Sequence, residues 1–545
     1  MEPFDLLQKY GVNAVRLRIW HTPGNVPESG GYCDLAHTIS MAEKIKKYGM
    51  QFMLDFHYSD FWADPGHQQK PKAWEGLEYR QLKDAVFAYT RDTLLALQEK
   101  GVLPDIVQIG NEIRSGLLFP EGELPDYAGM TGLVNEGIRA ARSVADSSKM
   151  QIMIHLDQGG RYFYLKEWFQ HAFEEGLMDF DLIGLSYYPF WHGTYTDLKE
   201  TMERLVKDYG KPIMIVESAY AWRKCENGFI DEAQEKIAGF PASPEGQHKV
   251  LDLVNGIVAS LPGQMGMGVF YWEPLCLPVN GVGAWAENMG LLDESGRVLE
   301  GIHAFEFTRE KYDPMEWAKV YEPQEITVGT GKQVTLPEEV SVLLMNGTLQ
   351  RKRVKWQTEA SVSFEKSGSF IIQGLVQEKM LPVSVSVRVT ESDAEKKNLL
   401  KDVNWDEGMV WWQTESSGEH LVAQIYPDFV EPYPAPPVNA LRVEGKQKFS
   451  YRICQQVRIM EAGDYCFEVE MQGTDTTGVS VFLFVKTEKE EKKILVHPTE
   501  HGFVKCRLEG IRLDAEPVTV GVSISASPMY VMMRRFSFYR MQQGK

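Results

Sequence analysis

Residues 106–112 read Ile-Val-Gln-Ile-Gly-Asn-Glu, a short β-rich run that stops at a glycine and continues at once into polar side chains. Similar runs lie on both sides of it, at 13–20, 51–57, 151–156, 182–186, 213–216 and 267–272. Helical segments alternate with these runs, near 2–10, 34–47, 79–100, 127–146, 162–175, 196–209 and 244–260. Apolar strands that alternate with helices are typical of parallel βα units in a barrel, so we predict a barrel with seven strands.

After about Thr308 the helical periodicity stops, and short alternating runs with Gly, Pro and Asn turns take over. Such runs favour small β-sandwiches. The predicted fold is therefore an α/β barrel followed by two all-β sandwich domains. We place the barrel at 1–308, an immunoglobulin-like sandwich at 322–390 and a jelly-roll sandwich at 396–542, with the charged segment 391–397 as the linker between the sandwiches.

Composition narrows the classes of partner. The 545 residues carry 57 Lys and Arg against 76 Asp and Glu, a net charge of −19. This net negative charge argues against nucleic acid as a partner, because affinity for that polyanion comes from clustered basic side chains. No apolar run approaches the ~20 residues that span a bilayer. The start of the chain lacks the basic then apolar pattern of a secretory signal, and the six cysteines show no metal-ligand spacing.

Two glutamates are predicted at the carboxyl ends of barrel strands, where the chemistry of such barrels lies. Glu112 follows the run at 106–110, and Glu217 follows the run at 213–216. An acid directly after an apolar strand is costly unless it is exposed, paired or used. The alternative to a catalytic role is that each glutamate is solvated or forms an ion pair with Arg16 or Arg18.

Facing carboxyl groups, one protonated and one ionised, are what cleavage of a glycosidic bond requires. The other strand ends supply aromatic rings that can stack on sugars and polar groups that can bond to hydroxyls. A pocket equipped in this way suits a neutral glycan better than a phosphate. The side chains in question are Arg16, Arg18, Trp20, His57, Asp60, Trp62, Asp64, Tyr187, Tyr188 and Trp272.

Six segments resemble glycoside hydrolase family 53, the endo-β-1,4-galactanases of the clan of retaining (β/α)8 glycosidases. One of them, 109–118, reads Ile-Gly-Asn-Glu-Ile-Arg-Ser-Gly-Leu-Leu, and the others occur in family order at 11–20, 55–65, 154–157, 186–190 and 271–274. The resemblance covers about residues 4 to 306. It implies a (β/α)8 TIM barrel that hydrolyses β-1,4-galactan, the side chains of type I arabinogalactan in pectin, with retention of configuration. We expect no cofactor.

The same resemblance implies roles for individual residues. Glu112 would be the general acid/base and Glu217 the nucleophile, with their carboxyl groups about 5 to 5.5 Å apart. Asn111 would bond the sugar 2-hydroxyl, and Tyr187 or Tyr188 would steer Glu217. The other substrate-binding residues would be Arg16, Arg18, His57, Asp60, Trp62, Asp157 and Trp272.

The chain also departs from the family. Members normally begin with a strand of the type Gly-x-Asp-x-Ser, but here Glu2 to Tyr10 already reads as the first helix. We therefore expect the first barrel strand, and any export signal, to be missing from this chain. The residues do not give the localisation, and the family implies a secreted or cell-surface protein. Residues 225–232 lack the alternating Asp and Asn that cage calcium, so we expect no metal.

The segment at 322–390 is similar to bacterial immunoglobulin-like spacers, and the last domain resembles jelly-roll carbohydrate-binding modules. Trp405, Trp411, Trp412, Tyr426 and Tyr433 are candidate sugar platforms in that domain, and a place in the core explains each of them equally well. Two other functions stay open. They are a different β-glycanase or β-galactosidase of the same clan, and a non-catalytic galactan-binding protein.

Overall fold

The structure is a computed structural model of the chain. It describes residues 2–225, 229–277, 286–323, 325–359, 361–390, 398–405, 407–418, 421–428, 438–445, 448–473, 480–499, 503–526 and 529–541. The chain divides into two compact units. One comprises Met1–Glu316 with Met345–Gly347, and the other comprises Trp317–Leu344 with Thr348–Lys545.

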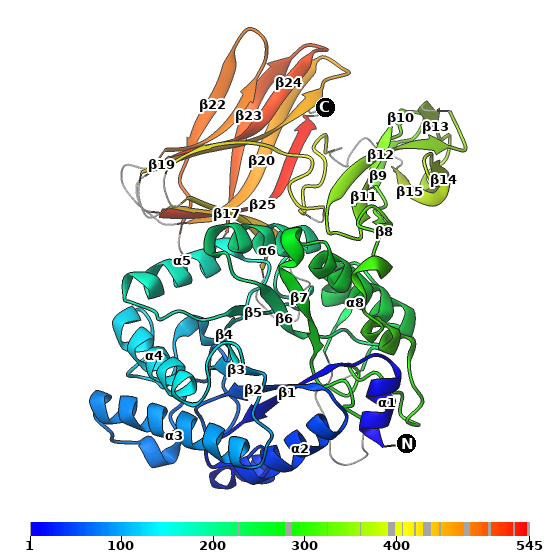
Figure 1. The fold of residues 1–545 in the computed structure, drawn as a ribbon. Coiled ribbons are helices and arrows are strands. Elements are labelled where there is room, and N and C mark those ends of the chain that lie inside the picture. The colour runs from blue at the N-terminus through cyan, green and yellow to red at the C-terminus, as the bar shows by residue number, and fades with distance from the viewer. Residues whose placement is uncertain are drawn as a thin grey trace. The chain divides into compact units, whose positions relative to one another are not determined.

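The first unit is built on one sheet of seven parallel strands in the order β1-β2-β3-β4-β5-β6-β7, drawn from blue to green in Figure 1. The strands are β1 (Ala14–Ile19), β2 (Gln51–Phe56), β3 (Ile106–Ile109), β4 (Gln151–Leu156), β5 (Leu182–Ser186), β6 (Ile213–Ser218) and β7 (Gly266–Tyr271). Each coincides with one of the runs in the sequence to within two residues. The predicted β/α barrel with seven strands is confirmed.

Helices connect the strands and lie on the outside of the sheet (Figure 1). They are α1 (Pro3–Lys9), α2 (Leu35–Lys47), α3 (Tyr79–Glu99), α4 (Tyr127–Val144), α5 (Tyr162–Glu174), α6 (Tyr195–Tyr209), α7 (Glu232–Ala238) and α8 (Pro244–Ala259). Local chemistry fixes their ends. Asp34 and Ser243 cap α2 and α8 by accepting backbone N–H groups, and Gly210 ends α6 in the left-handed region. Within the described part of the chain, no helix is both long and apolar enough to cross a membrane.

The strands differ in burial according to their place in the sheet. The central strands β2 to β6 are buried almost throughout, and the side chains of Met53, Met153 and Met214 meet in the barrel interior. Most residues of β1 and β7 are partly accessible, and Met267 on β7 is 45% exposed. A cavity of about 570 Å³ is lined by residues of β1, β7 and α1. The two end strands of the sheet are therefore less covered than the strands between them.

The second unit begins with a sheet of order β8-β11-β12-β14-β15-β9 and a separate pair, β10-β13. Its core is rich in valine and includes Trp356. One strand, β8, lies before the predicted domain start at 322. The strands are β8 (Trp317–Val320), β9 (Ile326–Gly329), β10 (Gln333–Thr335), β11 (Glu339–Leu344), β12 (Leu349–Trp356), β13 (Ser361–Ser363), β14 (Gly368–Val376) and β15 (Leu381–Thr390). The predicted linker at 391–397 lies outside the described residues.

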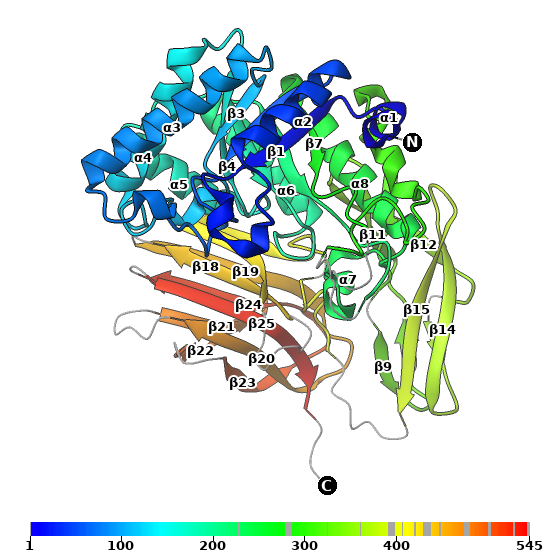
Figure 2. The ribbon, with the colours of Figure 1, turned by 90° about the horizontal axis from the view of Figure 1, so that it is seen from below.

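Two five-stranded sheets share one core in the rest of this unit, in the orders β16-β19-β24-β21-β22 and β17-β18-β25-β20-β23. Figure 2 shows β19, β24 and β21 side by side. The prediction of two all-β sandwiches is confirmed. The strands are β16 (Gln413–Ser417), β17 (Leu421–Asp428), β18 (Val438–Gly445), β19 (Phe449–Arg458), β20 (Gly463–Gly473), β21 (Ser480–Lys486), β22 (Glu491–Val496), β23 (Val504–Leu513), β24 (Pro517–Ala526) and β25 (Met529–Arg540).

Three tryptophans of this sandwich were candidate sugar platforms. Trp405 and Trp412 lie in its core, at 0% and 6% exposure, with their ring centroids 4.8 Å apart. The ring of Trp411 lies against two cations, 3.8 Å from the Arg351 guanidinium and 4.1 Å from Nζ of Lys401. Trp405 and Trp412 are therefore core residues, as the alternative held. The ring of Trp411 is in contact with two cations of the protein. The side chain of Tyr426 and all of Tyr433 lie outside the described residues.

Candidate active site

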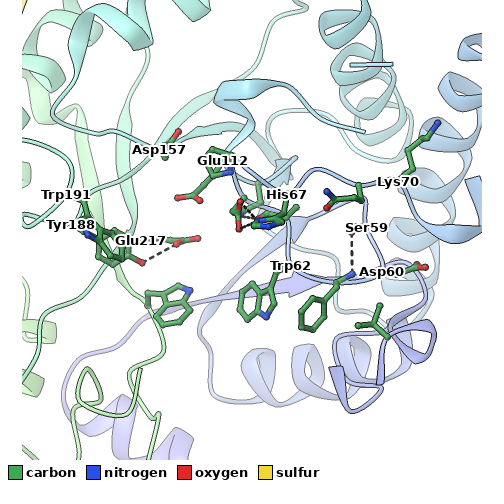
Figure 3. Close-up of a pocket in the computed structure, with 18 of the residues that line it drawn as sticks. Ser59, Asp60, Trp62, His67, Lys70, Glu112, Asp157, Tyr188, Trp191 and Glu217 are labelled. Atoms are coloured by element: carbon green, nitrogen blue, oxygen red, sulfur yellow. Dashed lines mark hydrogen bonds and ion pairs between the residues drawn. The ribbon is translucent and has the colours of Figure 1, made fainter. Parts of the chain in front are cut away.

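Two glutamates lie at the carboxyl ends of barrel strands. Glu217 is in β6, one residue before its end, and Glu112 lies three residues beyond β3. The chain turns sharply between β3 and Glu112, because Gly110 and Glu112 both have left-handed backbones, with φ of 81° and 49°. A non-glycine residue in that region is strained, which is a common property of functional sites. Figure 3 shows both glutamate side chains pointing into one pocket.

Arg16, on β1, connects the polar groups of the site. Its Nη1 lies 2.9 Å from Oε1 of Glu217, and its Nη2 lies 2.8 Å from both Oδ2 of Asp55 and Oδ1 of Asn111. Asp55 is fully buried, so the guanidinium compensates two carboxylates inside the barrel. The ion-pair alternative for Glu217 is therefore realised in the structure. It does not remove Glu217 from the pocket, which this residue also lines.

The two glutamates have different electrostatic surroundings. Burial raises the pKa of the Glu217 carboxyl, and the Arg16 guanidinium opposes that rise. Burial raises the pKa of Glu112 well above its ordinary range, and the charge of Glu217 raises it further. Because the cation pairs with Glu217, the surroundings favour the protonated form more at Glu112 than at Glu217. This difference suits a pair in which one carboxyl group gives a proton and the other is ionised.

Asn111 and His57 are held in single orientations. Nδ2 of Asn111 donates to the carbonyl of Ala63 at 2.7 Å, which leaves Oδ1 facing Arg16. The N–H of Ala63 donates to Nδ1 of His57 at 2.9 Å, and Nε2 of His57 lies 3.0 Å from Oδ2 of Asp55. Since Nδ1 accepts, Nε2 carries the hydrogen, and His57 donates to Asp55. His57 thus acts on the site through Asp55 and the loop at Ala63.

Tyr188 is the tyrosine that contacts Glu217. Its hydroxyl donates to Oε2 of Glu217 at 3.2 Å, and both side chains are buried. The hydroxyl of Tyr187 donates instead to the carbonyl of Gly193 at 3.0 Å. Neighbouring side chains at a strand end point to opposite sides, which explains why the two tyrosines have different partners. Of the two alternatives for steering Glu217, the geometry supports Tyr188.

The glutamates open into a cavity of about 820 Å³, within the size range of ligand sites. Figure 3 shows Tyr188 and Trp191 at one end of the view, Asp60 and Lys70 at the other, and the glutamates between them. Flat rings are the surfaces on which sugar rings stack, so the wall suits a glycan. The aromatic residues that line the cavity are Phe61, Trp62, Tyr188, Trp191, Phe229 and Trp272.

Arg18 supports this wall rather than lining it. Its Nη1 lies 2.8 Å from Oε1 of Glu273, and its guanidinium carbon lies 4.0 Å from the centre of the Trp62 ring. A cation against the ring face adds stacking energy and fixes the ring plane. The sequence prediction placed Arg18 directly on the substrate. In the structure its guanidinium contacts Glu273 and the face of the Trp62 ring, which supports a role through Trp62.

Two aspartates of the predicted site line the cavity and also have protein partners. Asp157 forms an ion pair with Arg114 at 2.8 Å. Asp60 organises the loops around the cavity. It accepts three hydrogen bonds at 2.8 to 3.0 Å, from the side chain of Asn25 and from the backbone N–H groups of Thr22 and Lys72.

The sequence predictions missed the polar residues inside the strands below the glutamates. Asp55 on β2, Gln108 on β3, His155 on β4 and Ser186 on β5 are fully buried and joined by hydrogen bonds. A polar residue inside an otherwise apolar strand is the signal that could have found them. Burying such a group costs free energy unless it has a partner, so its presence indicates a network.

The part of the chain that the structure describes contains no group of three or more His, Cys, Asp or Glu side chains placed to hold a metal ion. Residues 226–228, within the segment that lacks calcium-loop spacing, lie outside that part.

Comparisons with known families give two matches. A family model described as glycosyl hydrolase family 53 matches residues 1–305, over half of the chain. A second, described as a bacterial Ig-like domain (group 4), matches residues 321–380. The first match includes every strand of the barrel sheet and both glutamates.

Two named proteins and one solved catalytic domain are similar to the barrel part of this chain. The arabinogalactan endo-β-1,4-galactanase of Thermothelomyces thermophilus is 34% identical over 307 residues, which cover 55% of this chain and 90% of that protein. The protein of the same name from Cellvibrio japonicus is 35% identical over 330 residues, 57% of this chain and 84% of its own. The solved family 53 catalytic domain of Ignisphaera aggregans is 35% identical with a TM-score of 0.53, covering 57% of this chain and 89% of that one. The chain belongs to glycosyl hydrolase family 53.

Proposed function

We propose that the chain is a retaining endo-β-1,4-galactanase that acts on galactan, the side chains of type I arabinogalactan in pectin. The observation that carries the proposal is the pair of glutamates in one cavity, with Arg16 paired to Glu217 and the pKa of Glu112 raised well above its ordinary range by burial and by the charge of Glu217. The names of the similar proteins from Thermothelomyces and Cellvibrio support β-1,4-galactan as the substrate.

In the first step, the carboxylate of Glu217 attacks the anomeric carbon while Glu112 gives its proton to the glycosidic oxygen. A bond from Glu217 to the sugar forms as the glycosidic bond breaks, and the departing part of the chain leaves as an alcohol. Arg16 holds Oε1 of the nucleophile and Tyr188 holds Oε2. The plane of the attacking carboxylate is therefore set before the substrate arrives.

In the second step, Glu112 is a carboxylate and takes a proton from water as the water oxygen attacks the anomeric carbon. The bond from the sugar to Glu217 breaks, and both glutamates return to their starting protonation states. Two displacements at one carbon give net retention. Asn111, which lines the cavity next to Arg16, is proposed to bond the 2-hydroxyl of the sugar.

The remaining residues of the site fall into two groups by what they touch. Trp62 and Trp272, whose ring centroids lie 6.2 Å apart, line the cavity and are proposed to stack on sugar rings. Arg16, Arg18 and His57 act through Glu217, Trp62 and Asp55. Asp60 and Asp157 are proposed to accept hydrogen bonds from sugar hydroxyls at the cavity surface while they keep their hydrogen bonds and ion pair with protein groups.

The division into three domains is also a proposal, with a barrel at 1–308, an immunoglobulin-like spacer at 322–390 and a jelly-roll domain at 396–542. Separate sheets and cores on either side of the linker support it. A sugar-binding sandwich joined to a barrel would raise the local concentration of substrate. Limited proteolysis should cut first near 391–397 and release two stable fragments; uniform degradation of the second unit would contradict the boundary.

Analysis of the products from β-1,4-galactan separates the proposal from its alternatives. Short galacto-oligosaccharides as first products support an endo-galactanase. Release of galactose alone supports an exo-acting β-galactosidase of the same clan, and binding without hydrolysis supports a galactan-binding protein. Proton NMR of the fresh products should show the β-anomer first. An initial α-anomer would contradict a retaining mechanism.

A further inference from the structure

Behind Glu112 a chain of buried side chains leads away from the cavity. Oγ of Ser186 lies 2.6 Å from Oε1 of Glu112, and Nε2 of His155 lies 2.9 Å from Oγ of Ser186. Ser186 and His155 are both fully buried. His155 lies on β4, Ser186 ends β5, and Glu112 follows β3, so three adjacent strands supply one line of hydrogen bonds.

The donors around His155 set the direction of this line. Nε2 of Gln108 lies 3.1 Å from Nδ1 of His155, and the backbone N–H of Glu112 points at the same nitrogen from 3.4 Å. Oδ1 of Asn111 also lies 3.0 Å from Nδ1, but it already accepts from Nη2 of Arg16. Because the direction of the backbone N–H of Glu112 is fixed toward Nδ1, we infer that Nδ1 accepts and that Nε2 carries the ring hydrogen. The Gln108 amide donates most closely to Oδ1 of Asp55, at 2.5 Å, and its second hydrogen is shared among the carbonyl of Gly110 at 3.0 Å, Nδ1 of His155 and Oδ1 of Asn111. His155 donates to Ser186, and the hydrogen of Ser186 goes to Glu112.

His155 carries no charge in this position. Burial lowers its pKa well below the ordinary range, and the nearby Arg16 guanidinium lowers it further. A neutral imidazole has one hydrogen, which is committed to Ser186. The neutral ring therefore acts as a donor to Ser186.

We propose that Ser186 and His155 are positioning residues that reserve Oε1 of Glu112 as an acceptor, so that Oε2 carries the catalytic proton. The inference rests on the proposed function, in which Glu112 is the general acid. Oε1 already receives the Ser186 hydrogen across 2.6 Å, which opposes a second hydrogen on that oxygen. Within the described residues, Oε2 has no hydrogen-bond donor of its own and is left for the substrate.

The same bond serves both steps of the reaction. Once Glu112 has given up its proton it is a carboxylate, and the Ser186 hydroxyl still donates to Oε1. The side chain therefore keeps one orientation as it changes from acid to base, which avoids a reorganisation between the two steps.

Removing the Ser186 hydroxyl has a predictable effect on titration. The charges that face Glu112 are Glu217 on β6 and Asp157 after β4, which raise its pKa, and Arg16 on β1, which lowers it. The bond from Ser186 also lowers it, because that bond favours the carboxylate. Without the hydroxyl, Glu112 should keep its proton to a higher pH.

The test is the pH dependence of kcat/KM on β-1,4-galactan for Ser186→Ala, beside the wild type and Ser218→Ala. Ser218 is the matched control, because it also ends a barrel strand and is fully buried, but its Oγ has no hydrogen-bond partner among the described residues. Ser186→Ala should move the alkaline limb up by about one pH unit, the size expected for a bond to a charged group, and lower kcat about tenfold. An unmoved limb, or the same shift in Ser218→Ala, overturns the proposal.

A second measurement separates positioning of the acid from general damage. A dinitrophenyl β-galactobioside has a leaving group that needs no proton, so its first turnover should slow less than twofold in Ser186→Ala while galactan cleavage slows about tenfold. Equal losses on both substrates overturn the proposal. Ser186→Cys keeps a weak donor and should lie between serine and alanine, which provides the comparison if Ser186→Ala does not fold. A wild type that cleaves neither substrate would refute the proposed function itself.

Discussion

Nη1 of Arg16 lies 2.9 Å from Oε1 of Glu217, and both side chains are about nine-tenths buried. A buried ion pair loses its hydration, and that cost is offset only when further hydrogen bonds satisfy the remaining donors. Arg16 meets this condition, because its other terminal nitrogen contacts Asp55 and Asn111. The ion pair keeps the nucleophile ionised and in place, and it joins β1 to β6 across the barrel.

Replacing this cation should alter the acid side of the pH profile. In Arg16→Met the group that opposes the rise in the Glu217 pKa is gone, so that pKa moves higher. Glu217 would be protonated over more of the acidic range, and the ascending limb of kcat/KM should move to higher pH. Removing one partner of a buried pair should also lower stability by about 3–5 kcal/mol, measured by urea unfolding.

Arg16→Lys is the control for that experiment. Lysine keeps the charge but lacks the fork of donors that reaches Glu217, Asp55 and Asn111 together. Its acid limb should lie between those of the wild type and Arg16→Met. An acid limb that is the same in all three proteins would contradict the role given to Arg16.

Glu217→Ala should lose turnover by about four orders of magnitude, because no other carboxylate replaces the attacking atom. The measurement is kcat on galactan, with circular dichroism to show that the barrel is folded. Glu245→Ala is a suitable control, since Glu245 is an exposed acid that pairs with Lys249 on α8. Near-wild-type turnover in Glu217→Ala would remove it from the nucleophile role.

Glu112→Ala should respond to an external anion. Without the base, the sugar ester on Glu217 accumulates on substrates with good leaving groups, and azide can enter the space left by the carboxyl group. Added azide should raise turnover about tenfold or more and give a β-galactosyl azide, identified by NMR. An α-azide would indicate attack by azide at Glu217's position instead, and no rescue would weaken the assignment of Glu112.

The barrel could be predicted from sequence because an apolar run bounded by turns has few other interpretations. The runs at 151–156 and 182–186 coincide with β4 and β5 from end to end. The helix α7 was not predicted. Its seven residues include one large apolar side chain, Ile237, so no apolar face repeats at helical spacing, whereas the equally short α1 carries Phe4 and Leu7.

The sequence predicted which residues lie at the strand ends of the site, but it did not predict the contacts that their side chains make. Glu112 and Glu217 were found because they follow apolar strands. The sequence prediction for Arg18 did not include its partner Glu273, which lies 255 residues away in sequence. Which way a side chain at a strand end turns depends on that distant partner, and no pattern of alternation along one strand contains this information.

Glu112 should lower the stability of the fold in a pH-dependent way. Its pKa in the folded state is raised above the unfolded value of about 4.3. Below that pH Glu112 is protonated in both the folded and the unfolded state, so it does not lower the free energy of unfolding. As the pH rises through the folded pKa, the unfolded state is favoured by its earlier ionisation, so stability falls. Glu112→Gln, which stays neutral, should therefore melt at a higher temperature than the wild type at pH 8 and at the same temperature near pH 4.

A melting temperature of Glu112→Gln that is equal to that of the wild type at both pH values would show that Glu112 is solvated in the free enzyme. Glu123→Gln is the comparison, because Glu123 is an exposed acid of the same barrel and no burial opposes its charge. Its melting temperature should follow the wild type at both pH values.

Trp62→Ala should weaken substrate binding more than turnover. Trp62 lines the cavity, with the Arg18 guanidinium against its ring, and it touches neither glutamate through a hydrogen bond in the described structure. Loss of a stacking interaction of about 1.4 kcal/mol corresponds to a tenfold higher KM for galactotetraose with kcat changed less than threefold. Trp411→Ala is the matched control, since that ring is engaged by Arg351 and Lys401 in the second unit. It should leave KM for galactotetraose unchanged, and an equal rise in KM for both variants would contradict the assignment of Trp62 as the sugar platform.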